Sequence, residues 1–513
     1  MSISKKIIKK LMSQNKDIIA SKSSSHLTPL MPLMPLMQSI QRTNEWNWKT
    51  TSDLLQRYHE CKSVLFEHKF KPYDRVVYKG RNSFDFIAWN LAVNSLGGVW
   101  VPVYHNQNKE YMDYIMNDCT PKILVSDDQT TYNGTVCFAA NMGYGTHYFE
   151  NETFMPKRNI STLIYTSGTT GNPKGVMLSD DNIMSNINGI NNRFQEFQEK
   201  PLKTLNILPW AHIYSITTEL YYNLLNLNQI AISSGPEHFV KELFQVKPNV
   251  LYLVPKVLEL IKTKLERLDY PILKHAIPII LKKLFNQDFI TIFVGGAKLD
   301  YSTFQFYKKH NINICLGYGC SETSPMVSVN HMIHPRNEDS VGKLIDDVVV
   351  EVLNDEIMVS GPNVMKGYWN NQDATNEVLI QHNNKTYYKT GDSGFVKDGY
   401  LYLTGRISDN YKMSNGKFVN VATVESKMKE SISGNFIVYG EHKDYNILLT
   451  DINMKPDDLM KLCNKNLESY LHIKDILHIE NEIFQNYLTP KMSIKRKKLL
   501  NDYEEKIDAL YTR

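Results

Sequence analysis

One segment constrains this chain more than any other: a strand that runs directly into a loop rich in glycine and hydroxyl groups. Residues 162–165 read TLIY, which is typical of a buried strand, and residues 166–175 read TSGTTGNPKG. Glycines let the backbone approach a ligand, and hydroxyls with one lysine suit a polyphosphate. Because the GK[ST] ending of a Walker loop is missing, a different kind of phosphate loop is predicted. The residues expected to contact phosphate are Thr166, Ser167, Gly168, Thr169, Thr170, Gly171 and Lys174.

The alternation of segments predicts an α/β fold. From Trp46 to about residue 330, strand-like runs alternate with helix-like stretches, which favours βα units and a largely parallel sheet. After residue 340, the short runs VVVEVL, EIMVSG, TYYKTG and GYLYLTGR predict a small antiparallel or barrel-like lobe. The last hundred residues mix strand and helix patterns, as a small α+β domain does. We therefore expect a large domain over residues 41–404, with its β-rich part at about 340–404, and a small domain over 405–513.

Residues 1–40 differ from the rest, and we expect them to form a tail. Apolar and basic side chains alternate at helical spacing, as in a helix that lies on an anionic membrane surface. A targeting segment and a frayed, solvated terminus are the alternatives, and the repeated PLM of residues 29–37 is predicted to be a linker. The side chains concerned are Ile3, Ile7, Ile8, Leu11 and Met12, with Lys5, Lys6, Lys9 and Lys10.

Composition excludes several classes of function. The formal net charge of +4 is too small for the concentrated basic face of a nucleic-acid-binding protein. The six cysteines are scattered without a CxxC pair, which predicts neither a zinc site nor a disulfide framework and favours a reducing compartment. No apolar run reaches the roughly 18 residues of a membrane-spanning helix. We expect a cytoplasmic protein, with peripheral membrane contact through the N-terminal helix as an option.

Four further motifs follow the phosphate loop in order. GGAKL (295–299) comes after the strand-like run TIFV, and GYGCSET (317–323) comes after NICL. Such turns at the carboxyl ends of parallel strands are where open α/β sheets bind ligands. YKTGD (388–392) and GRISD (405–409) lie further on. Together with YTSGTTGNPKG, these motifs resemble the adenylate-forming superfamily of acyl-CoA synthetases, luciferases and peptide-synthetase adenylation domains, over roughly residues 45–510.

The resemblance implies ATP, Mg²⁺ and coenzyme A as ligands, and it implies roles for individual residues. Tyr318 would pack on adenine, Ser321 or Thr323 would face phosphate, and Glu322 would hold Mg²⁺. Asp392 would accept the ribose hydroxyls, and Arg406 would contact ribose or phosphate. The remaining implied positions are Gly295, Gly296, Ala297, Gly317 and Gly319 at the nucleotide, and His212 beside the carboxylate and acyl channel.

The resemblance also implies a mobile C-terminal domain. Asp409 would be its hinge, although the lysine that usually precedes this aspartate is Ser408 here. SNGKFVN resembles the long-chain branch of the family, and Gly416 within it would let the backbone approach the CoA arm.

A departure from the family concerns its catalytic lysine. In the closing motif NYLTPKMSIKRKK the expected lysine falls on Ser493, with Lys491 and Lys495 two residues to either side. A cation at this point would neutralise charge as a carboxylate approaches phosphate, and serine cannot supply it. Either Lys491 or Lys495 substitutes, or adenylation is slow, or the chain has lost catalysis and keeps nucleotide or lipid binding.

The implied activity is ATP-dependent conversion of a fatty acid to acyl-AMP with release of pyrophosphate, followed by thioester formation with CoA. Long-chain acids are indicated by SNGKFVN and the LTP ending. However, the start of FVGGAKL lies only about forty residues after the start of VPKVLELI, where the long-chain branch carries a larger helical segment, so medium-chain acids stay open. An acceptor other than CoA is a further alternative.

Overall fold

The computed structural model of the chain describes most of the sequence. The described residues are 2–22, 46–128, 132, 135–139, 159–166, 172–266, 281, 284, 291–331, 340–488 and 494–512. The linker predicted at residues 29–37 lies outside them. Among the described residues, no helix combines the length and apolarity that crossing a bilayer requires.

A six-stranded sheet carries the strand that leads into the phosphate loop. Its order is β6-β5-β3-β4-β7-β8, and all neighbours are parallel except β7 and β8. Helix α4 packs against β3 and β4 and is buried from Phe86 to Ser95. Its first turn is capped by Ser83, which accepts from the amide of Phe86. The elements are α3 (Thr51–Glu67), β3 (Arg75–Gly80), α4 (Phe84–Ser95), β4 (Val99–Tyr104), α5 (Lys109–Cys119), β5 (Ile123–Ser126), β6 (Val136–Ala139), β7 (Thr162–Thr166), β8 (Lys174–Leu178) and α6 (Asp180–Arg193).

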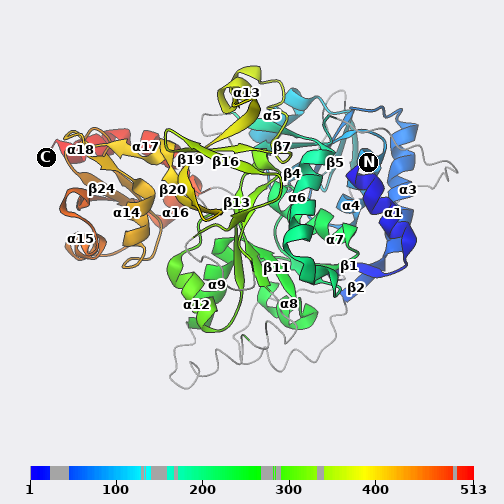
Figure 1. Cartoon of the computed structure of the whole chain (residues 1–513), viewed down its shortest axis with the longest axis horizontal. Helices are drawn as coiled ribbons and strands as arrows, with labels where there is room; N and C mark the ends of the chain where they lie inside the picture. Colours follow the sequence, from blue (N-terminus) through cyan, green and yellow to red (C-terminus); the bar gives the residue numbers. More distant parts are fainter. Residues whose placement is uncertain are drawn as a thin grey trace.

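A second, larger sheet lies at the centre of the molecule (Figure 1). Its main path is β11-β12-β13-β14-β15-β20-β19-β17-β16, with β18 paired to β19. The first three strands are parallel and the later pairs are antiparallel, as the change of sequence pattern after residue 340 predicts. The elements are β11 (Val250–Leu253), α9 (Pro255–Glu266), β12 (Thr291–Val294), α12 (Tyr301–Lys309), β13 (Ile314–Gly319), η3 (Ser321–Thr323), β14 (Met326–Val329), β15 (Lys343–Leu344), β16 (Val349–Leu353), β17 (Glu356–Ser360), α13 (Gln372–Val378), β18 (Leu379–His382), β19 (Lys385–Lys397) and β20 (Tyr400–Arg406).

The start of the chain is folded, and the predicted tail is wrong for residues 2–22. Helix α1 (Ile3–Ser13) buries Ile7 and Ile8 completely, in contact with α3, α4 and α6. Strand β1 (Asp17–Lys22) pairs in parallel with β10 (Gln229–Ile232), in a sheet of order β2-β1-β10-β9. The apolar face that a membrane would need is therefore occupied by the protein core. The neighbouring elements are β2 (Trp46–Thr50), η1 (Gln195–Gln198), β9 (Lys203–Asn206), the π-helix η2 (Ser215–Tyr221), α7 (Tyr222–Leu225) and α8 (Phe239–Val246).

The last hundred residues gather at the end of the molecule opposite α1 (Figure 1). They build two apolar clusters of their own, around Val438 and around Phe484, on either face of the sheet β23-β24-β25. The short helix η4 (Ile407–Asp409) joins this part to β20. The elements are β21 (Tyr411–Lys412), β22 (Phe418–Val419), α14 (Val421–Met428), β23 (Phe436–Tyr439), β24 (Asn446–Thr450), α15 (Pro456–Asn464), η5 (Ser469–Leu471), β25 (Ile473–His478), α16 (Asn481–Phe484), η6 (Gln485–Tyr487), α17 (Arg496–Asp502) and α18 (Glu504–Tyr511).

Candidate functional site

Residues from three separate motifs meet at the carboxylate of Asp392. Asp392 and Arg406 stand directly opposite each other on β19 and β20, and Arg406 Nε lies 2.8 Å from Asp392 Oδ1. Tyr318, at the end of β13, donates its hydroxyl to Asp392 Oδ2 at 2.7 Å. Burial raises the pKa of Asp392, and the neighbouring Arg406 acts in the opposite direction. Three sequence-predicted nucleotide residues therefore form a single polar cluster.

A second cluster surrounds Glu322, the carboxylate expected to hold Mg²⁺. Glu322 lies in the short helix η3, and its Oε1 accepts a hydrogen bond of 2.8 Å from the hydroxyl of Tyr368. Lys174, at the start of β8, lies with Nζ 5.1 Å from the centre of the Tyr368 ring, which is a cation–π distance. Tyr368 thus links the predicted metal carboxylate to the predicted phosphate lysine. Among the described residues, no group of three or more His, Cys, Asp or Glu side chains is arranged to hold a metal.

The two glycine turns lie at the carboxyl ends of β12 and β13. A Cβ on Gly319, whose φ is +154°, would lie 1.8 Å from the carbonyl oxygen of Pro325, so no other residue fits. Gly295 is buried against the ring of Tyr214, whereas Gly296 and Ala297 are exposed.

The two hydroxyl residues of η3 are both buried. The hydroxyl of Thr323 accepts from the amide of Cys320 at 3.0 Å and lies 2.6 Å from the carbonyl oxygen of Pro325. The hydroxyl of Thr323 therefore makes its hydrogen bonds within the turn. Ser321 is the better candidate of the two for facing phosphate.

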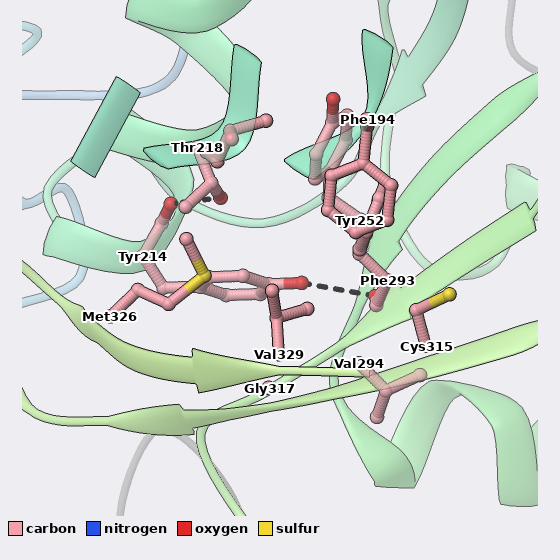
Figure 2. A pocket seen from close by; sticks show the side chains of 11 residues that line it. Phe194, Tyr214, Thr218, Tyr252, Phe293, Val294, Cys315, Gly317, Met326 and Val329 are labelled. Carbon is pink, nitrogen blue, oxygen red and sulfur yellow. Dashed lines mark hydrogen bonds between the residues drawn. The ribbon is translucent and has the colours of Figure 1, made fainter. Parts of the chain in front are cut away.

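An apolar cavity lies beside these turns (Figure 2). Side chains from α6, η2, β11, β12, β13 and β14 line it, among them Tyr214, Tyr252 and Phe293. His212, which we expected at the acyl channel, is not among the lining residues. Its Nδ1 accepts from the amide of Tyr214 at 3.1 Å, so it caps the turn that presents Tyr214 to the cavity.

The C-terminal candidates lie apart from the cavity. Asp409 lies 3.8 Å from Nε of Arg496, the first residue of α17, and Arg496 is also ion-paired with Glu425 of α14. Lys495, immediately before α17, is exposed. Gly416 lies in the turn between β21 and β22 with φ +76°, and the space beside its Cα is open.

Several predicted residues fall outside the described part of the chain. They are the centre of the phosphate loop, Ser167, Gly168, Thr169, Thr170 and Gly171, and the residues of the closing motif, Lys491 and Ser493.

Sequence reasoning missed three residues: Tyr368, which contacts Glu322 and Lys174, and the ion pair of Glu425 with Arg496 next to Asp409. The tyrosine has a local signal, because it follows Gly367 in a GYW run just before a helix. Glu425 and Arg496 have no such signal, since 71 residues separate two side chains that meet only in the fold. From the sequence alone, charged side chains of this kind are predicted to lie on solvent-exposed faces of helices.

Comparison with known proteins gives a consistent result. The family model described as AMP-binding enzyme matches residues 35–369. The long-chain-fatty-acid–CoA ligase FadD15 of Mycobacterium bovis is 24% identical over 537 residues, and the match covers 86% of this chain and 88% of that protein. Among solved structures, the A domain of carboxylic acid reductase from Segniliparus rugosus, in complex with AMP and a co-purified carboxylic acid, has a TM-score of 0.80 at 18% identity, covering 100% of this chain and 94% of that chain. O-succinylbenzoate coenzyme A synthetase (MenE) of Bacillus subtilis, in complex with AMP, has a TM-score of 0.74 at 20% identity, covering 90% and 97%.

The class of protein is thereby defined as an adenylate-forming ligase with an α/β fold, and the resemblance seen in the motifs is confirmed. The chain belongs to the family of AMP-binding enzymes.

Proposed function

We propose that this chain activates a fatty acid with ATP as an acyl-adenylate, releases pyrophosphate, and then transfers the acyl group to the thiol of coenzyme A. An anionic carboxylate is a poor electrophile, and its mixed anhydride with AMP is reactive toward a thiol. The relatives named as fatty-acid–CoA ligases support the acid and the acceptor.

One observation carries the proposal: two consecutive residues of β13 face the two halves of such a reaction. Gly317 lines the apolar cavity, and Tyr318 donates to Asp392 in the polar cluster. An acid whose tail enters the cavity would bring its carboxylate to the nucleotide cluster. Holding two reactants in this way is a large part of the catalysis that a positioning enzyme provides.

The polar clusters fit the proposed ligands. Oδ2 of Asp392 accepts a hydrogen bond from Tyr318, and Oδ1 is ion-paired with Arg406. Each oxygen has a further lone pair, so the carboxylate still has capacity for a ribose diol. Glu322 would hold Mg²⁺ together with phosphate oxygens and waters, as is usual for this ion. The cation would neutralise charge on the departing pyrophosphate. Lys174, with Nζ 5.1 Å from the centre of the Tyr368 ring, would add a second positive charge near the phosphates.

The transfer to CoA would need a movement of the C-terminal part. We propose that residues 410–512 rotate about Asp409 after adenylation and bring the turn around Gly416 toward the site. The open space beside Gly416 and the exposure of Phe418 next to it are consistent with backbone contact to an extended ligand.

The test is an assay with Mg-ATP and a panel of fatty acids, with and without CoA, in which pyrophosphate, acyl-AMP and acyl-CoA are measured. In the variant Asp392→Asn we expect kcat/KM for ATP to fall roughly 10- to 100-fold, the range for losing a hydrogen bond to a charged group. Asp398→Asn is the matched control, because Asp398 lies exposed in the turn of the same hairpin and should leave the rate unchanged.

The outcomes separate the alternatives. Acyl-CoA from the wild type supports the proposal. Pyrophosphate without acyl-CoA means that another acceptor takes the acyl group. Absence of pyrophosphate with every acid overturns the proposal, and recovery of the reaction in Ser493→Lys would then identify an impaired homologue.

A further inference from the structure

A packed group of aromatic rings forms one side of the apolar cavity. Phe194, which follows α6 and is completely buried, stacks on Phe197 with ring centres 5.3 Å apart and planes 15° apart. Phe194 also stacks on His331, with ring centres 5.3 Å apart and planes 5° apart. Phe293 meets Phe194 edge-on at 5.0 Å and stacks on Tyr252 at 5.5 Å. These rings, with Phe194 at their centre, are called the aromatic floor below (Figure 2 shows Phe194, Tyr252 and Phe293).

Polar contacts hold His331, one of the rings that stack on Phe194. His331 Nε2 lies 3.0 Å from the carbonyl oxygen of Arg193 and 3.3 Å from a carboxylate oxygen of Glu196. Both partners flank Phe194 in sequence. Because the ring of Phe194 packs against His331, Phe197 and Phe293, it has little freedom to swing aside and lengthen the cavity.

The chemistry of the walls selects an apolar occupant. The Tyr214 hydroxyl donates to the carbonyl oxygen of Phe293 at 3.0 Å, and the Thr218 hydroxyl donates to the carbonyl oxygen of Tyr214 at 2.6 Å. Their donors are thus already used within the protein. Among the described residues that line the cavity, none is charged. A second carboxylate or an ammonium group on the substrate would therefore be buried without a partner, which is strongly unfavourable.

The size of the cavity limits the occupant further. Its empty volume is about 340 Å³, a figure that includes the part open to solvent. This volume counts all the space between atoms, so it is an upper limit. At roughly 30 Å³ per non-hydrogen atom, the share of a water molecule in the liquid, even the whole of it would hold about eleven atoms. The tail of a sixteen-carbon fatty acid, without its carboxylate, has fifteen carbon atoms.

We propose that the aromatic floor makes Phe194 a specificity-determining residue and restricts the acid to a singly charged, apolar, medium-chain or shorter molecule. This inference rests on the proposed function, and it departs from the long-chain preference that SNGKFVN indicates. The motif would contact CoA, whereas the aromatic floor would contact the acyl chain.

The experiment measures ATP–pyrophosphate exchange with saturated acids from four to eighteen carbons, using the full chain. For the wild type we expect the highest kcat/KM at ten carbons or fewer, with the sixteen-carbon acid at least 100-fold lower. In Phe194→Ala we expect the optimum to move toward longer acids by two or more carbons. Phe239→Ala is the matched control, because Phe239 is equally buried but belongs to a different apolar cluster, and its chain-length profile should equal that of the wild type.

The inference and the proposed function fail in different ways. Exchange that is as fast with sixteen carbons as with eight in the wild type overturns the inference and leaves the ligase intact. No exchange with any acid overturns the proposed function itself. If Phe194→Ala does not fold, Phe194→Leu and Phe194→Trp replace it. An unchanged optimum in Phe194→Leu, or one that does not shorten in Phe194→Trp, contradicts the role of the floor.

Discussion

At the scale of single residues, Glu219 is an unusual group in this protein. It is completely buried in the π-helix η2, where Asn206, Ser215 and Thr204 donate hydrogen bonds to its carboxylate. Burial raises the pKa of Glu219 from 4.5 to about 7, although these hydrogen bonds act in the opposite direction. The group therefore titrates in the folded protein near neutral pH.

This shift has a defined effect on stability. Because the folded pKa is raised, the contribution of Glu219 is fully present below about pH 4.5 and is lost as the pH rises through about 7. The shift corresponds to roughly 3 kcal/mol. We expect the melting temperature of the wild type, relative to that of Glu219→Gln, to fall as the pH rises from 5 to 8. Thermal unfolding at several pH values measures this, and a pH-independent difference between the two proteins would rule it out.

The residues of the candidate site were predictable to different degrees. Asp392, Tyr318 and Arg406 belong to local motifs, and their convergence follows from where the strands end. Tyr368 and the aromatic floor were not predicted, because contacts such as Phe194 with Phe293 join segments about a hundred residues apart. In a sequence, an aromatic residue at helical spacing indicates only a core position. Which cavity it lines is known only from the fold.

At the scale of elements, the strand patterns were informative and the first helix was misleading. The runs VVVEVL, EIMVSG, TYYKTG and GYLYLTGR are strands β16, β17, β19 and β20, as predicted. Helix α1 has the alternating lysines of a surface helix, and Lys9 and Lys10 are indeed exposed. Its apolar side, however, packs into the core through Ile7 and Ile8. An amphipathic pattern shows that a face must be covered, but it does not identify the covering surface.

The position of α1 leads to a stability prediction. Ile7→Ala should destabilise the protein by about 2–5 kcal/mol, the usual cost of truncating a fully buried isoleucine. Lys10→Ala, on the exposed side of the same helix, should change stability by about 0.5 kcal/mol or less. Chemical denaturation of both variants measures the difference. Equal effects would mean that α1 is not packed as described.

At the scale of the whole molecule, the C-terminal part has apolar clusters and a sheet of its own. Both of its apolar clusters are formed by residues between Tyr411 and Leu510, and its sheet pairs only within itself among the described residues. A described contact to the large part is the 3.1 Å hydrogen bond from Lys298 to Ser426. Such a unit is suited to moving as a rigid body.

We therefore expect residues 410–513, expressed separately, to unfold in one cooperative transition. Circular dichroism during heating measures it, and Val438→Asp serves as a variant that should abolish the transition, since Val438 is completely buried. A gradual, non-cooperative loss of signal in the unmodified segment would contradict an independent core.

The pairing of β1 with β10 has a consequence for how the chain is made. Ile19 and Ile230 are partners, yet 210 residues are synthesised between them. At about 5–20 residues per second, a ribosome needs roughly 10–40 s to cover that distance. During this interval β1 lacks its partner β10, so part of its apolar surface stays exposed close to the lysines of α1. Chaperones are suited to shield such a segment.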